Sequence, residues 1–257
     1  MLLMAGILRA LGRGSWSHDP RRVWTRYERE ARRPLHCLLF LVPLAVVYEI
    51  GAAWVARGDS PGRGPLAQSM IHGLLAWFGV AGFWVPGVVL VLSLLVWHRL
   101  RRDHWRMHAW VLAGMIGESL VLTIPLLVLS GLFPQERRPA AAGLLAELVR
   151  VLGAGVYEEL VFRLLLISGL TWLLAEFVRL RGNMALGLAV GVASIVFSRC
   201  HFSPIGSDAF AWGSFCFRLT AGVYLSAVFL GRGPGVSGGC HVAYNILLVL
   251  LRSGAAD

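Results

Sequence analysis

Residues 140–180 read AAAGLLAELVRVLGAGVYEELVFRLLLISGLTWLLAEFVRL, an almost unbroken apolar stretch with a helical pattern. At about 1.5 Å per residue, a helix of about 40 residues is about 60 Å long, which is twice the hydrocarbon thickness of a bilayer. The stretch therefore predicts either two helices or one helix with a break near its adjacent glutamates. Gly153 and Gly155 weaken the helix at that place.

The whole chain shares this apolar character. It has 257 residues, of which 57% are hydrophobic and 15% charged, and its mean hydropathy is +0.67. A soluble domain carries about 25% charged residues, so this composition is typical of an integral membrane protein. No soluble domain of useful size remains once the apolar stretches are removed, and we expect a single membrane domain.

The apolar stretches predict an all-α fold, a polytopic bundle of transmembrane helices around a polar intramembrane cavity. Residues 66–80 are moderately apolar and are interpreted as a short or re-entrant helix rather than a full span. The predicted number of spans is seven or eight, depending on whether residues 140–180 form one helix or two. The other predicted spans cover residues 35–55, 83–97, 109–133, 185–202, 211–230 and 239–251.

Arginine carries all the basic charge outside histidine, since the sequence contains no lysine, and the net charge is +10. The arginines lie at the ends of apolar runs, which favours contact with anionic membrane lipids over nucleic-acid binding. Residues 1–34 are interpreted as a basic interfacial segment and residues 35–252 as the membrane domain. With further arginines in residues 98–106 and at Arg179 and Arg181, the positive-inside rule predicts a multi-pass protein of the cell (inner) membrane with a cytoplasmic N-terminus.

Three charges, Glu158, Glu159 and Arg163, lie close together in the middle of this apolar stretch. An ionised carboxylate at membrane depth costs about 2.5–3.5 kcal/mol, so two adjacent ones require a partner or a task. On a helix, Glu159 and Arg163 are four residues apart, with the acid first, which is the favoured order for an ion pair. Glu158 is rotated by about 100° from Glu159, so it is free to act elsewhere as a general base.

Two polar pairs follow in later spans. Phe197-Ser-Arg-Cys-His201 ends an apolar helix with a histidine, and His241-Val-Ala-Tyr-Asn245 places a histidine and an asparagine on one helix face. Together with Glu158, these side chains come from three helices that could converge on one polar cavity. A glutamate and a histidine can take a proton from a shared water, while a histidine and an asparagine amide can donate hydrogen bonds to an oxyanion.

In these motifs the sequence resembles the CPBP (CAAX-processing and bacteriocin-processing) family of intramembrane glutamic proteases, which are related to type II CAAX prenyl endopeptidase. The resemblance covers about residues 140–252, the expected protease core. The family motifs EExxxR, FxxxH and HxxxN are matched, in this order, by Glu158-Glu159 with Arg163, Phe197 with His201, and His241 with Asn245.

The resemblance implies an intramembrane endopeptidase that hydrolyses a peptide bond of a membrane-associated protein. It implies that a glutamate and a histidine activate a water, while a second histidine and an asparagine stabilise the oxyanion. The predicted catalytic residues are, in that order, Glu158, His201, His241 and Asn245, and the residues that hold the shape of the site are Glu159, Arg163 and Phe197.

Alternatives stay open at this point. The protease is expected to need no cofactor, but Glu158, His201 and His241 could ligate zinc and leave one position open for water. A catalytically inactive scaffold or immunity-type protein of the same family would lack a motif residue, and none is missing. A transporter with an ionisable cluster at the midplane would show internal repeats, and none is visible.

The expected substrate is a membrane-anchored or C-terminally processed protein. Two further acids, Glu49 and Glu118, lie inside predicted spans. Since an intramembrane acid marks a functional site by default, each is expected to line the cavity, contact the substrate or pair with an arginine such as Arg218. Glu147 and Arg150 are three residues apart and are predicted to pair with each other.

Overall fold

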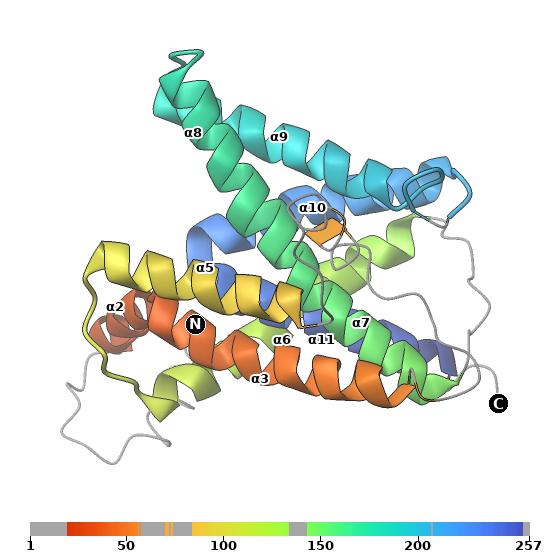
Figure 1. Ribbon diagram of the computed structural model, residues 1–257, viewed down its shortest axis with the longest axis horizontal. Coiled ribbons are helices and arrows are strands. Elements are labelled where there is room, and N and C mark those ends of the chain that lie inside the picture. Colours follow the sequence, from red (N-terminus) through yellow and green to blue (C-terminus); the bar gives the residue numbers. More distant parts are fainter. Residues whose placement is uncertain are drawn as a thin grey trace.

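The computed structural model of the chain describes residues 20–55, 57, 70, 71, 73, 84–133, 143–206 and 208–253 (Figure 1). Over these residues the structure is helical, with a single isolated β-bridge between Phe202 and Asp208, so the predicted all-α class is confirmed. The helices are α2 (Pro20–Ala31), α3 (Pro34–Val55), α5 (Val85–Arg101), α6 (Ala109–Leu132), α7 (Leu144–Glu158), the π-helix η1 (Glu159–Ile167), α8 (Ser168–Glu176), α9 (Gly182–Cys200), α10 (Trp212–Arg232) and α11 (Pro234–Ser253).

Five of these helices are long and apolar enough to cross a membrane, namely α3, α6, α9, α10 and α11. The chain is therefore a multi-pass membrane protein. α5, with 17 residues, and the separate segments α7, η1 and α8 are not among the five, so the predicted number of seven or eight spans is not confirmed. Most of the predicted helix at 66–80, and residues 1–19 of the predicted interfacial segment, lie outside the described residues.

α7, η1 and α8 follow one another without a gap, so residues 144–176 form one long helix that runs diagonally across the molecule (Figure 1). Of the two alternatives for residues 140–180, the structure thus has the single helix. Its hydrogen bonding changes at Glu159, where the α-helix gives way to a π-helix. The predicted weak points, Gly153 and Gly155, lie inside the regular part of α7.

α11 is the central helix of the bundle and packs against α3, α6, α7 and α10. Its residues 234–242 are all buried. The helix begins five residues before the predicted span 239–251, because its glycines pack against neighbouring helices and packing outweighs their low helix propensity. A Cβ atom on Gly238, for example, would lie 2.7 Å from Cδ2 of Leu41 in α3.

α2 docks on the end of the bundle through one apolar face, on which Val23, Tyr27 and Ala31 are buried. The Tyr27 hydroxyl donates a hydrogen bond of 2.7 Å to Oε2 of Glu118 in α6. Burial, together with the nearby carboxylate, raises the pKa of Tyr27 far above its usual value, so its hydroxyl stays protonated. The described part of the basic N-terminal segment is therefore held by the protein itself.

Gly155 is the position at which α7 approaches α11 most tightly among the contacts that position the site. A Cβ atom there would lie 2.8 Å from the backbone nitrogen of Val242 and 2.9 Å from its Cα. We predict that Gly155→Ala lowers the free energy of unfolding by about 1–3 kcal/mol, because the backbones have to separate. Thermal unfolding of the purified protein in detergent measures this change.

The matched control is Gly169→Ala in α8, where a new Cβ has nothing within 4 Å. This variant should be as stable as the wild type, or more stable by up to about 1 kcal/mol because alanine favours a helix. Equal effects at the two positions would show that close contact with α11 is not what Gly155 provides.

Candidate active site

The two adjacent glutamates lie where the long helix changes its geometry. Glu158 is the last residue of α7, and Glu159 is the first residue of η1. In a π-helix the hydrogen bonds join residues five apart, so the turn is wider than in an α-helix, and such segments are frequent at functional sites. His201 directly follows α9, and His241 and Asn245 lie on α11, so three helices supply the motif residues as predicted.

Glu159 is enclosed by partners and is 1% exposed. Its Oε1 lies 3.1 Å from Nη1 of Arg163 and 3.0 Å from Nδ1 of His241, and its Oε2 accepts a hydrogen bond of 2.5 Å from the Ser237 hydroxyl. The guanidinium of Arg163 also lies over the ring of Phe197, 4.4 Å from its centroid. The predicted ion pair between Glu159 and Arg163 is thus present.

Glu158 faces the two histidines. Its Oε1 lies 3.5 Å from Nε2 of His201, and its Oε2 lies 3.7 Å from Nε2 of His241. Both separations are ion-pair contacts, longer than the usual 2.7–3.2 Å of a direct hydrogen bond. This spacing is suited to a small molecule, such as a water, that contacts both the carboxylate and an imidazole. Glu158 is buried, and its carboxylate has one ion-pair contact with each of these two imidazoles.

The spacing of the FxxxH motif fixes the imidazole of His201. Its Nδ1 lies 2.7 Å from the carbonyl oxygen of Phe197, one helical turn earlier. Since a carbonyl only accepts hydrogen bonds, Nδ1 carries the proton and Nε2 is left to face Glu158. The Phe197 ring packs edge-on against the imidazole with centroids 5.0 Å apart, so this residue holds His201 and Arg163 at the same time.

His241 bridges the two glutamates, with Nδ1 toward Glu159 and Nε2 toward Glu158. The buried cluster contains two carboxylates and one guanidinium, which leaves one negative charge. Burial penalises an unbalanced charge, so the arrangement favours a proton or a cation beside Glu158.

Asn245 lies one turn after His241 on α11 and is only partly buried. Its Nδ2 donates a hydrogen bond of 3.3 Å to the carbonyl oxygen of Val151 in α7. The structure thus brings Glu158, His201 and His241 together, whereas the amide of Asn245 points to the backbone of α7. Its predicted role in binding an oxyanion requires that the amide turn toward the cluster.

Ser237 is a site residue that the sequence did not reveal. Its hydroxyl donates to Glu159, and it is fully buried. A serine in a run of glycines carries no chemical pattern by itself. The signal that could have identified it is its spacing of four residues from His241, which puts both side chains on the same face of α11.

The other intramembrane acids have partners of their own. Glu49 accepts a hydrogen bond from the hydroxyl of Tyr157, the residue before Glu158. It also lies at a hollow of about 260 Å³ between α3 and α5, whose other lining residues are apolar except at the backbone. No motif residue lines this hollow, so the expectation that Glu49 lines the polar cavity around the motif residues is not confirmed.

Glu118 pairs with an arginine, as expected, but that arginine is Arg232 at the end of α10, with Nε 2.5 Å from Oε1. Nη2 of Arg218, the example suggested, lies 2.6 Å from Oδ2 of Asp208. Asp208 in a loop and Arg232 at a helix end both lie outside the apolar runs that guided the prediction. The predicted pair of Glu147 and Arg150 is present.

The residues also offer a donor set for zinc, since Glu, His and His are its usual ligands. Each imidazole has Nδ1 held by an oxygen and Nε2 turned to Glu158, which is how zinc-binding histidines are oriented. Bonds of about 2.0–2.1 Å place tetrahedral ligands about 3.3 Å apart. Within the described ranges, the one group of three side chains whose ligand atoms all lie within 4.8 Å of one another is elsewhere, so closing this set on an ion requires side-chain movement.

Comparison with known proteins bears on the same part of the chain. Residues 140–247 match the family model described as Type II CAAX prenyl endopeptidase Rce1-like. The match spans all three motifs and confirms the resemblance that they gave. No curated protein and no solved structure matched the chain.

Removing the cation of the buried pair should be costly. We predict that Arg163→Met lowers the free energy of unfolding by about 3–5 kcal/mol, because Glu159 would keep its charge without a guanidinium partner. Both side chains of the pair are 1% exposed, so solvent cannot replace the lost partner. The measurement is thermal or denaturant unfolding in detergent.

Arg150→Met is the matched control, since Arg150 pairs with Glu147 on the same helix but the two side chains are 33% and 25% exposed. It should cost about 0–1 kcal/mol, as expected for an ion pair near the surface. Similar losses for the two variants would mean that burial does not set the importance of Arg163.

Proposed function

We propose that this chain, whose residues 140–247 match the type II CAAX prenyl endopeptidase Rce1-like family model, is an intramembrane endopeptidase of the CPBP/CAAX protease family that cuts membrane-associated protein substrates. The single observation that carries the proposal is the placement of Glu158 between two imidazoles. Nδ1 of His201 is held by the Phe197 carbonyl, and Nδ1 of His241 is held by Glu159. In both rings Nε2 is turned to Glu158. A carboxylate held in this way is suited to take a proton from water.

In the proposed reaction, a water gives one proton to the pair Glu158–His201 as its oxygen bonds to the carbonyl carbon of the substrate. The carbonyl oxygen becomes an oxyanion, which accepts hydrogen bonds from His241 and from the Asn245 amide after it turns away from Val151. The carbon–nitrogen bond then breaks, and the leaving amine takes the proton from the pair. The bonds and protons balance without a cofactor.

Glu159 has a specific part in this proposal. The Nδ1 proton of His241 is directed at Glu159, so Nε2 can donate to an oxyanion only when the ring is an imidazolium. The carboxylate of Glu159 stabilises that cation, as a carboxylate does behind the histidine of a catalytic triad. Arg163 and Ser237 hold the carboxylate in place.

The surroundings of the cluster support a membrane-bound substrate. α9, which directly precedes His201, and α11, which contains His241, are among the helices able to cross a membrane. The presence of every motif residue favours catalysis over a scaffold role. The family description names a CAAX prenyl endopeptidase, so we propose a substrate that is processed near its C-terminus. We further propose that the end bearing α2 faces the cytoplasm of the cell (inner) membrane, since α2 and the arginines at 99–106 lie at that end (Figure 1).

Glu158→Gln tests the mechanism directly. The amide keeps the size of the side chain but cannot accept a proton, so we expect cleavage to fall by at least about 100-fold, the range of general-base catalysis. Membrane fractions from cells that carry the wild type or the variant are compared by mass spectrometry of protein C-termini. A farnesylated peptide with a CAAX end serves as a probe with purified protein.

Glu147→Gln on the same helix is the control, because Glu147 is partly exposed and lies outside the cluster. It should cleave like the wild type, and both variants should elute as folded protein in size-exclusion chromatography. Cleavage by folded Glu158→Gln at the wild-type rate would contradict the proposed mechanism.

Metal removal distinguishes a metal-free protease from a zinc-dependent one. If Glu158 and His201 act on water alone, tag-free protein that has been exhaustively chelated should keep its cleavage rate on the same peptide probe. If Glu158, His201 and His241 instead hold zinc, the rate should vanish with the metal and return when zinc is added. The metal content of the stripped protein is verified by elemental analysis.

A further inference from the structure

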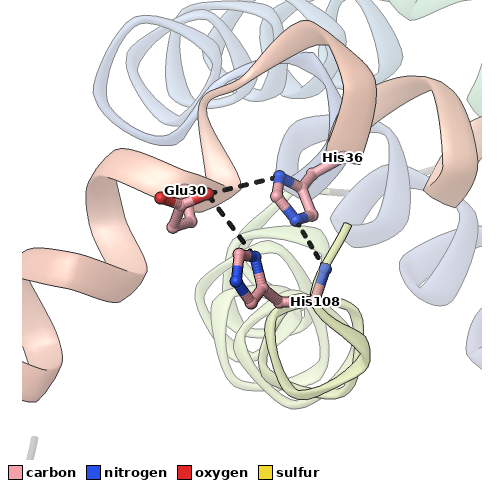
Figure 2. Close-up of side chains that lie close together, drawn as sticks. All are labelled: Glu30, His36 and His108. Carbon is pink, nitrogen blue, oxygen red and sulfur yellow. Dashed lines mark hydrogen bonds and ion pairs between the residues drawn. The ribbon is translucent and has the colours of Figure 1, made fainter. Parts of the chain in front are cut away.

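Three side chains from three elements point toward one another where α2 meets α3 and α6 (Figure 2). They are Glu30 in α2, His36 in α3, and His108, which directly precedes α6. Oε2 of Glu30 lies 3.9 Å from Nδ1 of His36 and 3.9 Å from Nδ1 of His108. None of the three belongs to the cluster around Glu158.

The atoms that face one another are buried and form no hydrogen bond, although Oε2 of Glu30 also has an ion pair of 3.0 Å with Arg33. A separation of 3.9 Å is too long for direct hydrogen bonding between them. Buried polar atoms are almost always paired, and the two Nδ1 atoms are aimed at a carboxylate oxygen that already pairs with Arg33, which indicates a partner shared by the three side chains.

We propose that this group, the Glu30–His36–His108 site, binds a divalent transition metal of the zinc class. The site provides two imidazole nitrogens and one carboxylate oxygen, a donor set that zinc uses when it keeps its fourth position for water. One ligand atom from each residue lies within 4.8 Å of the other two. The two rings are nearly parallel, with centroids 6.0 Å apart, and both Nδ1 atoms face the same oxygen of Glu30.

A water and a metal ion both fit a site of this size, and the donor set favours the metal. Tetrahedral zinc holds its ligands about 3.3 Å apart, while a water with tetrahedral hydrogen bonds holds its partners about 4.6 Å apart. The two oxygen–nitrogen separations of 3.9 Å lie between these values, so the ligand atoms need to move toward one another to reach an ion. Such movement is available to His108, whose side chain is 30% exposed.

Two existing interactions have to change when the metal enters. The backbone N–H of His108 donates to Nε2 of His36 at 3.2 Å, so the neutral ring carries its proton on Nδ1. Coordination at Nδ1 moves that proton to Nε2, and the N–H at the start of α6 loses its acceptor. Arg33, whose side chain is 26% exposed, turns from Glu30 into solvent. The metal therefore binds more weakly at low pH, where protons compete for the imidazoles.

An ion at this place joins three elements that are otherwise held by few polar contacts. It fastens the basic helix α2 to the ends of α3 and α6, next to the hydrogen bond of Tyr27 with Glu118. Its role is structural, since binding to the folded state alone raises the stability of that state. The inference is independent of the proposed protease activity.

Zinc binding to tag-free protein that has been stripped of metal tests the site. Titration calorimetry should give one zinc per chain, and zinc should raise the temperature of unfolding. His108→Phe keeps a ring that can stack on His36 but removes a ligand, and it should bind zinc at least about tenfold more weakly. His104→Phe, at an exposed position before the same helix, should bind zinc like the wild type.

If His108→Phe does not fold, Glu30→Gln replaces it with the same expected loss of affinity. If the wild type shows no saturable zinc binding, the proposal is overturned and a water is the better occupant of the site. Equal affinity in wild type and His108→Phe also overturns it. So does binding that is lost in His241→Ala but kept in His108→Phe, since the ion would then lie in the cluster around Glu158.

Discussion

Two adjacent carboxylates inside an apolar helix bundle have to be neutralised, and the arrangement of the other helices follows from this requirement. Arg163 on the same helix neutralises only Glu159, which also draws Ser237 and His241 from α11. Glu158 is left with His201 from the end of α9 and with the second nitrogen of His241. The long helix, α9 and α11 must therefore meet at one depth, and the polar chemistry of the protein is concentrated there.

Short side chains make this meeting possible. Serine and histidine reach a glutamate on another helix only if the two backbones come close, and α11 lies against α7 at Gly155 and against α3 at Gly238. The glycines before His241 therefore let the first turns of α11 pack in the centre of the bundle. The π-helix that begins at Glu159 widens the opposite surface, so that both glutamates can face partners from different helices.

The sequence was most informative where a charged side chain lies within an apolar segment. Glu158, Glu159 and Arg163 could be recognised because their cost in an apolar helix is large. The histidines at positions 201 and 241 could be recognised only because each belongs to a motif that follows in order in a later span. The partners were harder to foresee. Ser237 is an ordinary residue in a glycine run, and the start of α11 depends on packing that overrides glycine's low helix propensity. The direction of the Asn245 amide depends on which carbonyl of α7 lies opposite, and no periodicity in one chain encodes that neighbour.

A second buried carboxylate is neutralised at the end of the bundle that carries α2. Glu118 is buried in α6 and is neutralised by Arg232, which also pairs with Glu28 of α2. Gly233 follows with a φ of +88°, a conformation that glycine adopts without strain, and α11 begins at the next residue. One turn later Ser237 binds Glu159. Because Arg232, Gly233 and Pro234 are consecutive, the residue that binds Glu28 and Glu118 lies directly before the start of α11, the helix that carries Ser237 and His241.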